Sequence, residues 1–150
     1  MKRGALLLTV VGALLSILAG MRYIMTSEFM PYHAEVVGKA WTQVEFRTQA
    51  IFLGMLRIIG ASFIACGVTQ LWLIPPLQAG QRWACWASLT LALLIWGPTQ
   101  YVTLFLRTVV PEAQTPVVAT AAVLSALLLG SLGHFYVLRR LGKKKSPSIA

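Results

Sequence analysis

Acidic residues are nearly absent from this sequence. It contains no Asp and only four Glu, against thirteen Lys and Arg. The four carboxylates are Glu28, Glu35, Glu45 and Glu112, and all of them lie outside the long apolar runs. A proton relay through the apolar runs is therefore excluded, because such relays depend on acidic side chains inside the membrane.

Cysteine and histidine are equally scarce. Cys66 and Cys85 form no CxxC pair, and His33 and His134 are predicted to lie on opposite sides of a membrane. No GxSxG or comparable nucleophile motif occurs. We therefore predict no metal centre, no cofactor and no catalytic residue. An enzyme that uses His33 and Glu35 is the weakest of three functional hypotheses.

Apolar residues dominate what is present. The 150-residue chain is 57% hydrophobic and 11% charged, with a mean hydropathy of +0.73, which is too apolar for a soluble domain of this size. The net charge of +9 would suggest nucleic acid, but seven of the thirteen cationic residues lie near the two ends, at 2–3 and 139–145. This distribution indicates membrane spans held by a positive cytoplasmic side, not a nucleic-acid-binding surface.

Four apolar runs predict an all-α integral membrane protein, a single-domain four-helix bundle with both ends in the cytoplasm. The predicted spans are residues 4–24, 49–74, 83–106 and 117–138. An outer loop occupies 25–48, and a basic tail that attracts anionic lipid headgroups occupies 139–150. The expected location is the cell inner, or plasma, membrane, as a multi-pass protein.

The first run is short enough to be compared with a cleavable signal peptide. Cleavage after Ala19 would place Ile17 at the third-last position, where a small residue is required. An uncleaved first span is therefore favoured.

The outer loop carries an apolar repeat at helical spacing. Val36, Val37, Ala40, Trp41 and Val44 would share one face of a short interfacial amphipathic helix. Trp41 is the predicted anchor at the level of the lipid headgroups, where an indole ring is favoured.

The second span contains the only charge predicted to lie well within a span, Arg57. Gly54, Ala61 and Ala65 share its face at helical spacing, and small residues of this kind mark helix contacts in membranes. We therefore expect Arg57 to point into the bundle. The alternative is that its side chain extends outward to the headgroups.

On the third span, Gln100, Thr103 and Arg107 form a polar stripe above Gly97, which with Pro98 predicts a kink. If Arg57 and Gln100 face each other, they form an outward-opening polar pocket. The loop residues expected to cover this pocket are Glu28, Tyr32, His33 and Glu35. The competing interpretation is a set of polar contacts that only fixes helix register.

One segment of the chain resembles a known family. Leu56 and Arg57, followed by Gly60 and Gly67 within residues 53–73, are similar to the pattern of small four-helix DoxX-like bacterial membrane proteins. The resemblance implies a four-helix bundle that accompanies membrane redox or quinone-linked enzymes, with many members having no assigned activity.

The first functional hypothesis is a non-catalytic accessory or structural subunit of a larger membrane complex, because the loops are short and no catalytic constellation is present. The second is a ligand-binding or transport-like protein. Its pocket would hold an anionic lipid, a quinone headgroup or a small acid beside Arg57 and Gln100.

Overall fold

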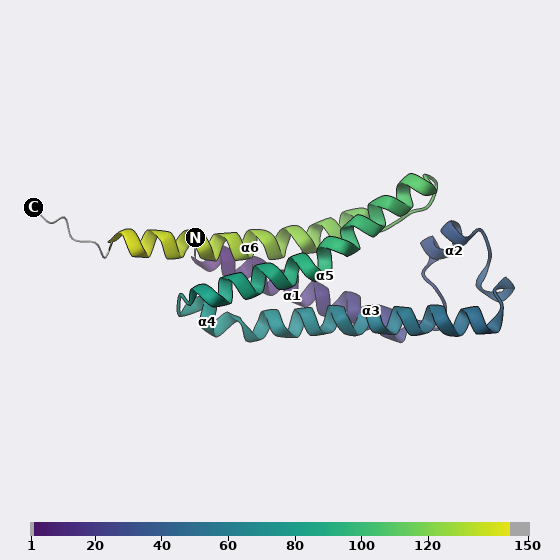
Figure 1. The fold of residues 1–150 in the computed structure, drawn as a ribbon, viewed down its shortest axis with the longest axis horizontal. Helices are drawn as coiled ribbons and strands as arrows, with labels where there is room; N and C mark the ends of the chain where they lie inside the picture. The colour runs from purple at the N-terminus through teal and green to yellow at the C-terminus, as the bar shows by residue number, and fades with distance from the viewer. Residues whose placement is uncertain (1, 145–150) are drawn as a thin grey trace, which may run out of the picture.

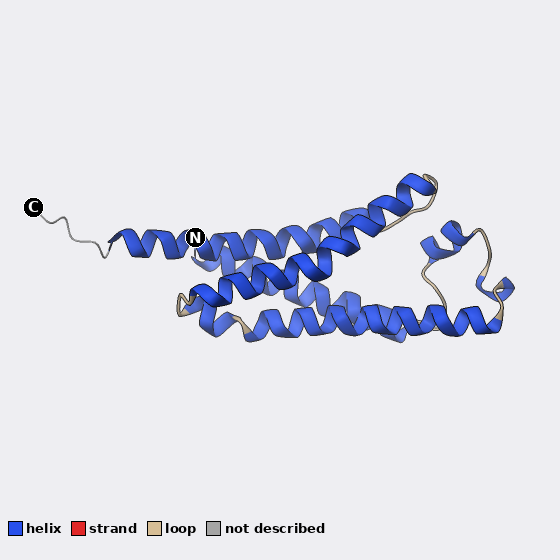
Figure 2. Ribbon diagram, in the orientation of Figure 1, coloured by secondary structure: helices blue, strands red, loops and turns tan. Residues whose placement is uncertain are grey.

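Four long helices coincide with the four apolar runs. The structure is a computed structural model that describes the backbone of residues 2–144 and the side chains of residues 3–140. Its elements are α1 (Lys2–Met25), α2 (Pro31–Val37), the 3-10 turn η1 (Trp41–Gln43), α3 (Phe46–Trp72), α4 (Ile74–Gln78), α5 (Arg82–Val109) and α6 (Val117–Lys144). Among these described residues all regular structure is helical (Figure 2).

The predicted fold class is confirmed at this level. Four helices, of 23 to 28 residues, are apolar and long enough to cross a membrane. At 1.5 Å per residue each is about 35–42 Å long, against about 30 Å of hydrocarbon. Their bounds lie within three residues of the predicted spans. Of the predicted basic tail, the side chains beyond residue 140 lie outside the described part of the chain.

Helix α1 packs against α3 and α6, and α5 packs mainly against α6 (Figure 1). Glycines make the α1–α3 contact close. A Cβ placed on Gly60 would lie 2.7 Å from the carbonyl oxygen of Gly20, and one on Gly67 would lie 2.5 Å from that of Ala13. Backbones that approach this closely maximise dispersion contacts, which drive helix association in lipid.

The core lies where α3, α5 and α6 meet. Phe63 stacks on Trp96 with ring centroids 4.4 Å apart, and the cluster around them also contains Cys66, Ala92, Val123 and Leu127. Beyond this point α5 bends away from α3, after the internal Pro98 (Figure 1). Proline has no N–H for the helical hydrogen bond, so a bend is expected there.

The two ends of the bundle differ. We call the end covered by residues 26–45 and 110–116 the loop end, and the end at which α1 begins and α4 lies the terminal end. The apolar repeat in the loop does not form the predicted single helix. Helix α2 ends at Gly38, which adopts φ +69°, and a separate turn begins at Trp41. The location of Trp41 at a lipid headgroup stays a prediction.

Candidate functional site

Arg57 does not point into the bundle, contrary to the prediction. Its residue is exposed on α3, as are Ala61 and Ala65, and a Cβ on Gly54 would meet nothing within 4 Å. The face of α3 that packs is instead the one that carries its buried residues, Leu56, Gly60, Phe63, Cys66, Gly67 and Gln70. The outward-opening pocket built on Arg57 and Gln100 therefore has no structural basis.

The register of the helices also fixes the depth of Arg57. Gly60 lies against Tyr23 and Ile24, and α1 ends at Met25. Arg57 is one helical turn closer to the loop end than Gly60, so it lies level with the end of α1. From that level a long guanidinium side chain reaches the membrane surface easily.

The polar stripe of α5 packs against α6. The Thr120 hydroxyl donates a hydrogen bond to Gln100 Oε1 at 2.6 Å and lies 3.2 Å from the Thr103 hydroxyl. Thr103 and Thr120 are buried, whereas Arg107 is exposed. Gln100, Thr103 and Thr120 therefore contact one another through their polar groups. This matches the interpretation that polar contacts set helix register.

Loop residues attach the loop to the bundle. The Tyr32 hydroxyl lies 2.7 Å from that of Tyr23 on α1, and the backbone N–H of Gln114 donates to the Glu35 carboxylate at 2.7 Å. Burial, followed by the neighbouring Tyr23, raises the pKa of Tyr32 well above its ordinary value. Tyr32 therefore stays protonated and acts as a structural hydroxyl.

The remaining loop residues predicted for a site are structural or exposed. His33 Nδ1 accepts a hydrogen bond from the backbone N–H of Met30 at 3.2 Å, and burial lowers the pKa of His33 below its ordinary value. Trp41 packs edge-on against Phe29, with centroids 4.7 Å apart. Glu28 is exposed. These side chains fold the loop and do not converge on a ligand pocket.

A buried polar chain, which the sequence analysis missed, joins three helices near the terminal end. Ser88 donates to Gln70 Oε1 at 2.7 Å, Gln70 donates to the Ser88 carbonyl at 2.9 Å, and the Ser88 and Ser131 hydroxyls lie 2.8 Å apart. All three residues are fully buried. The available signal was Gln70 itself, an amide within an apolar run that requires a partner.

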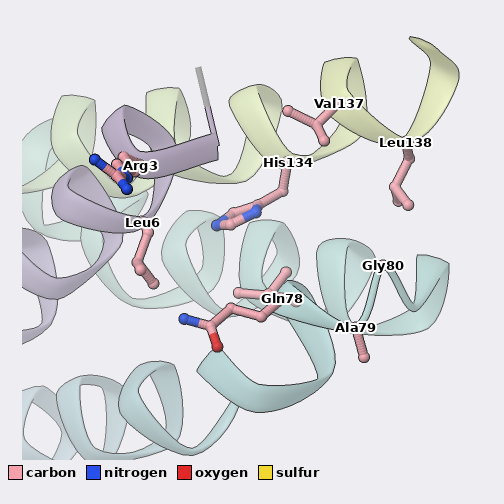
Figure 3. A pocket seen from close by; sticks show the side chains of 9 residues that line it. Arg3, Leu6, Gln78, Ala79, Gly80, His134, Val137 and Leu138 are labelled. Carbon is pink, nitrogen blue, oxygen red and sulfur yellow. The ribbon is translucent and has the colours of Figure 1, made fainter. Parts of the chain in front are cut away.

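A cavity lies at the terminal end of the bundle, at the opposite end from the predicted pocket. It has a volume of about 400 Å³ and is lined by Arg3, Leu6, Leu77, Gln78, Ala79, Gly80, His134, Val137 and Leu138 (Figure 3). His134 is only 6% exposed, and its Nε2 is buried without a hydrogen-bond partner. Leaving such a group unsatisfied costs about 1–3 kcal/mol. Sequence patterns do not indicate this arrangement, because it depends on three segments far apart in the chain.

Neither cysteine suggests chemistry. Cys66 and Cys85 are free and buried. Across the part of the chain that the structure describes, no group of three or more His, Cys, Asp or Glu residues is placed to hold a metal ion.

Comparisons with known proteins add no assignment. The similarity of Leu56, Arg57, Gly60 and Gly67 to the DoxX-like pattern stays a prediction. No protein-family model, curated protein or solved structure matches this chain.

Proposed function

We propose that this protein is a non-catalytic accessory subunit of the inner membrane, with both ends in the cytoplasm, and that it docks through α3 onto a larger membrane protein. The observation that carries this proposal is the face of α3 on which Arg57, Ile58, Ala61 and Ala65 are exposed and Gly54 is partly exposed, which we call the Arg57 face.

The polar groups of the bundle support a structural role. Gln70 pairs with Ser88, Gln100 pairs with Thr120, and the indole N–H of Trp96 donates to the Ser16 hydroxyl at 3.0 Å. Each of these groups has a partner in another helix, so it is occupied in fixing the packing. None forms the nucleophile and base pair that group-transfer chemistry requires.

The Arg57 face combines small residues with an unmatched charge. Ala61 and Ala65 would let a second helix approach closely. The described spans carry no carboxylate, since all four Glu residues lie outside them. No counter-charge for Arg57 therefore lies within the spans themselves. A carboxylate on a partner helix would provide it by a charge-assisted hydrogen bond, whereas a lipid phosphate would provide it without any docking.

The test is co-purification from native membranes in mild detergent, quantified by mass spectrometry. Ala61→Trp would block close approach on the Arg57 face without changing charge. Ala122→Trp is the matched control, because Ala122 is an exposed alanine within the apolar part of α6. Arg57→Leu would remove the charge, and Arg57→Lys would retain it.

The proposal expects a stoichiometric larger protein that is lost with Ala61→Trp and retained with Ala122→Trp. Arg57→Leu should weaken the complex by roughly tenfold, because the charge is lost. Arg57→Lys should weaken it by less, because the ammonium keeps the charge but cannot form the two parallel hydrogen bonds that a guanidinium makes to a carboxylate. Retention of the partner by all four variants, or purification of the native chain without a partner, would overturn it.

The second candidate function is ligand binding. The observation that favours it is the cavity at the terminal end, at the opposite end of the bundle from the predicted outward-facing pocket. Its chemistry is independent of the Arg57 face.

A further inference from the structure

The cavity at the terminal end is formed where three segments meet: the beginning of α1, the α4 turn and the last third of α6 (Figure 3). Its volume of about 400 Å³ falls within the range of about 300–1,000 Å³ that is usual for small-molecule sites. Its walls are mainly apolar, with polar groups contributed by Arg3, Gln78 and His134.

Close helix contacts fix the position of these polar groups. A Cβ on Gly133 would lie 2.8 Å from the Ala5 Cβ, and a Cβ on Gly130 would lie 2.6 Å from the Thr9 hydroxyl. The first turns of α1 are therefore pressed against α6, with Arg3 one half-turn beyond Ala5. Gly80, with φ +76°, closes the other side and would contact Leu138 at 3.1 Å if it carried a Cβ.

His134 is the buried polar residue in the wall of this cavity. It is buried, its Nε2 has no hydrogen-bond partner, and its ring points into the space between Leu6 and Gln78 (Figure 3). One turn earlier on the same helix, Ser131 is equally buried but satisfied, since it bonds Ser88 and the Leu127 carbonyl. Of these two buried polar residues, Ser131 has hydrogen-bond partners, whereas His134, which lines the cavity, has an Nε2 without one.

We propose that this cavity binds the phosphate group of an anionic glycerophospholipid. The guanidinium of Arg3 provides the positive charge and a forked donor geometry suited to phosphate. A neutral imidazole can carry its proton on Nε2 and donate it to a phosphate oxygen, and the Gln78 amide offers further donors.

The surroundings of the cavity favour an anionic lipid in particular. The lining residues include no carboxylate, so nothing in the wall would balance the cation of a zwitterionic headgroup. Leu6, Leu77, Val137 and Leu138 provide apolar walls for the glycerol and the first acyl carbons. Arg3 lies at the end of the α1 span, the depth at which lipid phosphates are found. A soluble phosphate ester shares the phosphate chemistry but would leave these apolar walls unused.

The experiment uses the full chain, delipidated in detergent and titrated with phosphatidylglycerol, phosphatidylcholine or inorganic phosphate, with native mass spectrometry as the readout. The variants are His134→Leu, which removes the Nε2 donor, and His134→Gln, whose amide nitrogen replaces it. Ser125→Leu is the matched control, because Ser125 is an exposed polar residue on the same helix. Arg3→Gln is paired with Arg82→Gln, since Arg82 is exposed at the same end but does not line the cavity.

We expect one tightly held phosphatidylglycerol, weakened roughly tenfold by His134→Leu and by Arg3→Gln. His134→Gln should restore most of the binding, and Ser125→Leu and Arg82→Gln should leave it unchanged. Phosphatidylcholine should bind more weakly. Equal binding of both lipids, equal effects of lining and control variants, or binding of inorganic phosphate without phosphatidylglycerol would each overturn the lipid assignment. Size-exclusion profiles of His134→Leu and Ser125→Leu separate loss of ligand from loss of folding.

Discussion

The α1–α3 pair and the α5–α6 pair hold together by different means. In the first, Gly20, Gly60 and Gly67 bring two backbones into direct contact. In the second, hydroxyl and amide groups form hydrogen bonds across the interface, between the Ser88 and Ser131 hydroxyls and from the Thr120 hydroxyl to Gln100 Oε1. Water does not drive helix association inside lipid, so close packing and polar bonds are the two available sources of stability.

The two helix pairs should therefore tolerate different substitutions. A contact built on glycine has no space for an added methyl group, but it contains no side-chain polarity to lose. A contact built on hydrogen bonds allows more space but depends on every donor having its acceptor. The following predictions test that contrast.

The largest effect is expected from Gly60→Ala. The added Cβ would lie 2.7 Å from the Gly20 carbonyl oxygen and 2.8 Å from Ile24 Cγ1, so the two helices must separate. We expect a loss of about 1–3 kcal/mol in stability, the usual range for overpacking. Thermal unfolding in detergent, together with the monodisperse fraction after size exclusion, measures this loss.

Gly54→Ala is the control for this prediction, because it makes the same change on the same helix where a Cβ meets nothing within 4 Å. It should be neutral or slightly stabilising, since alanine favours a helix more than glycine does. If both variants behave alike, the α1–α3 contact is not held by close glycine packing.

A smaller loss is expected from Ser88→Ala, which removes the hydroxyl between Gln70 and Ser131. Buried acceptors left without a donor should lower stability by about 1–2 kcal/mol. Ser62→Ala is the control, because the Ser62 hydroxyl bonds only to Ile58 of its own helix. Adding Gln70→Leu to Ser88→Ala should recover part of the loss, since no amide then remains unsatisfied. Failure of the double variant to recover would show that volume, not polarity, controls this contact as well.

Hydropathy was sufficient to place the four spans. Whether a segment is long and apolar enough to cross a membrane depends on the residues of that segment alone, and not on its neighbours in the fold. The face of α3 that packs against the other helices was predicted wrongly. Helix α3 has two faces that carry small residues. One carries Gly54, Ala61 and Ala65, and the other carries the packed glycines Gly60 and Gly67. With apolar residues all around the helix, periodicity cannot choose between them, and the choice depends on where α1 carries Gly20.

The candidate site was harder to predict than the fold. The spacing of Gln100 and Thr103 predicted that they share one face of α5, and both contact Thr120 of α6. Arg57 was assigned to the same site by the wrong choice of face on α3. The cavity around His134 was not predicted at all. Its walls come from residues about 70 and 130 positions apart along the chain, and only the packed structure places them together.

The smallest effect is expected at a third kind of contact, a hydrogen bond to His33, which lies outside the apolar spans and has a side chain that titrates. His33 Nδ1 accepts the Met30 N–H, and burial lowers the pKa of His33 from its ordinary value of 6.5. Protonation would turn that acceptor into a donor. The unfolded loop therefore binds more protons than the folded loop, and the contribution of His33 to stability is present above about pH 6.5 and is lost as the pH falls below it.

The protection factors of residues 26–45 against hydrogen exchange, taken relative to the intrinsic exchange rate at each pH, should consequently fall on acidification in this range. The glycine contacts and hydroxyl bonds of the helix pairs should keep their protection, because they contain no group that titrates there. His33→Asn is the matched variant, since its amide oxygen can accept the same N–H without titrating. We expect a flat pH profile for His33→Asn and a sloping one for the native chain. Identical slopes would place the pH-sensitive group elsewhere in the loop, and a slope that extends into α1 and α3 would show that the loop and the glycine-packed pair unfold as one unit.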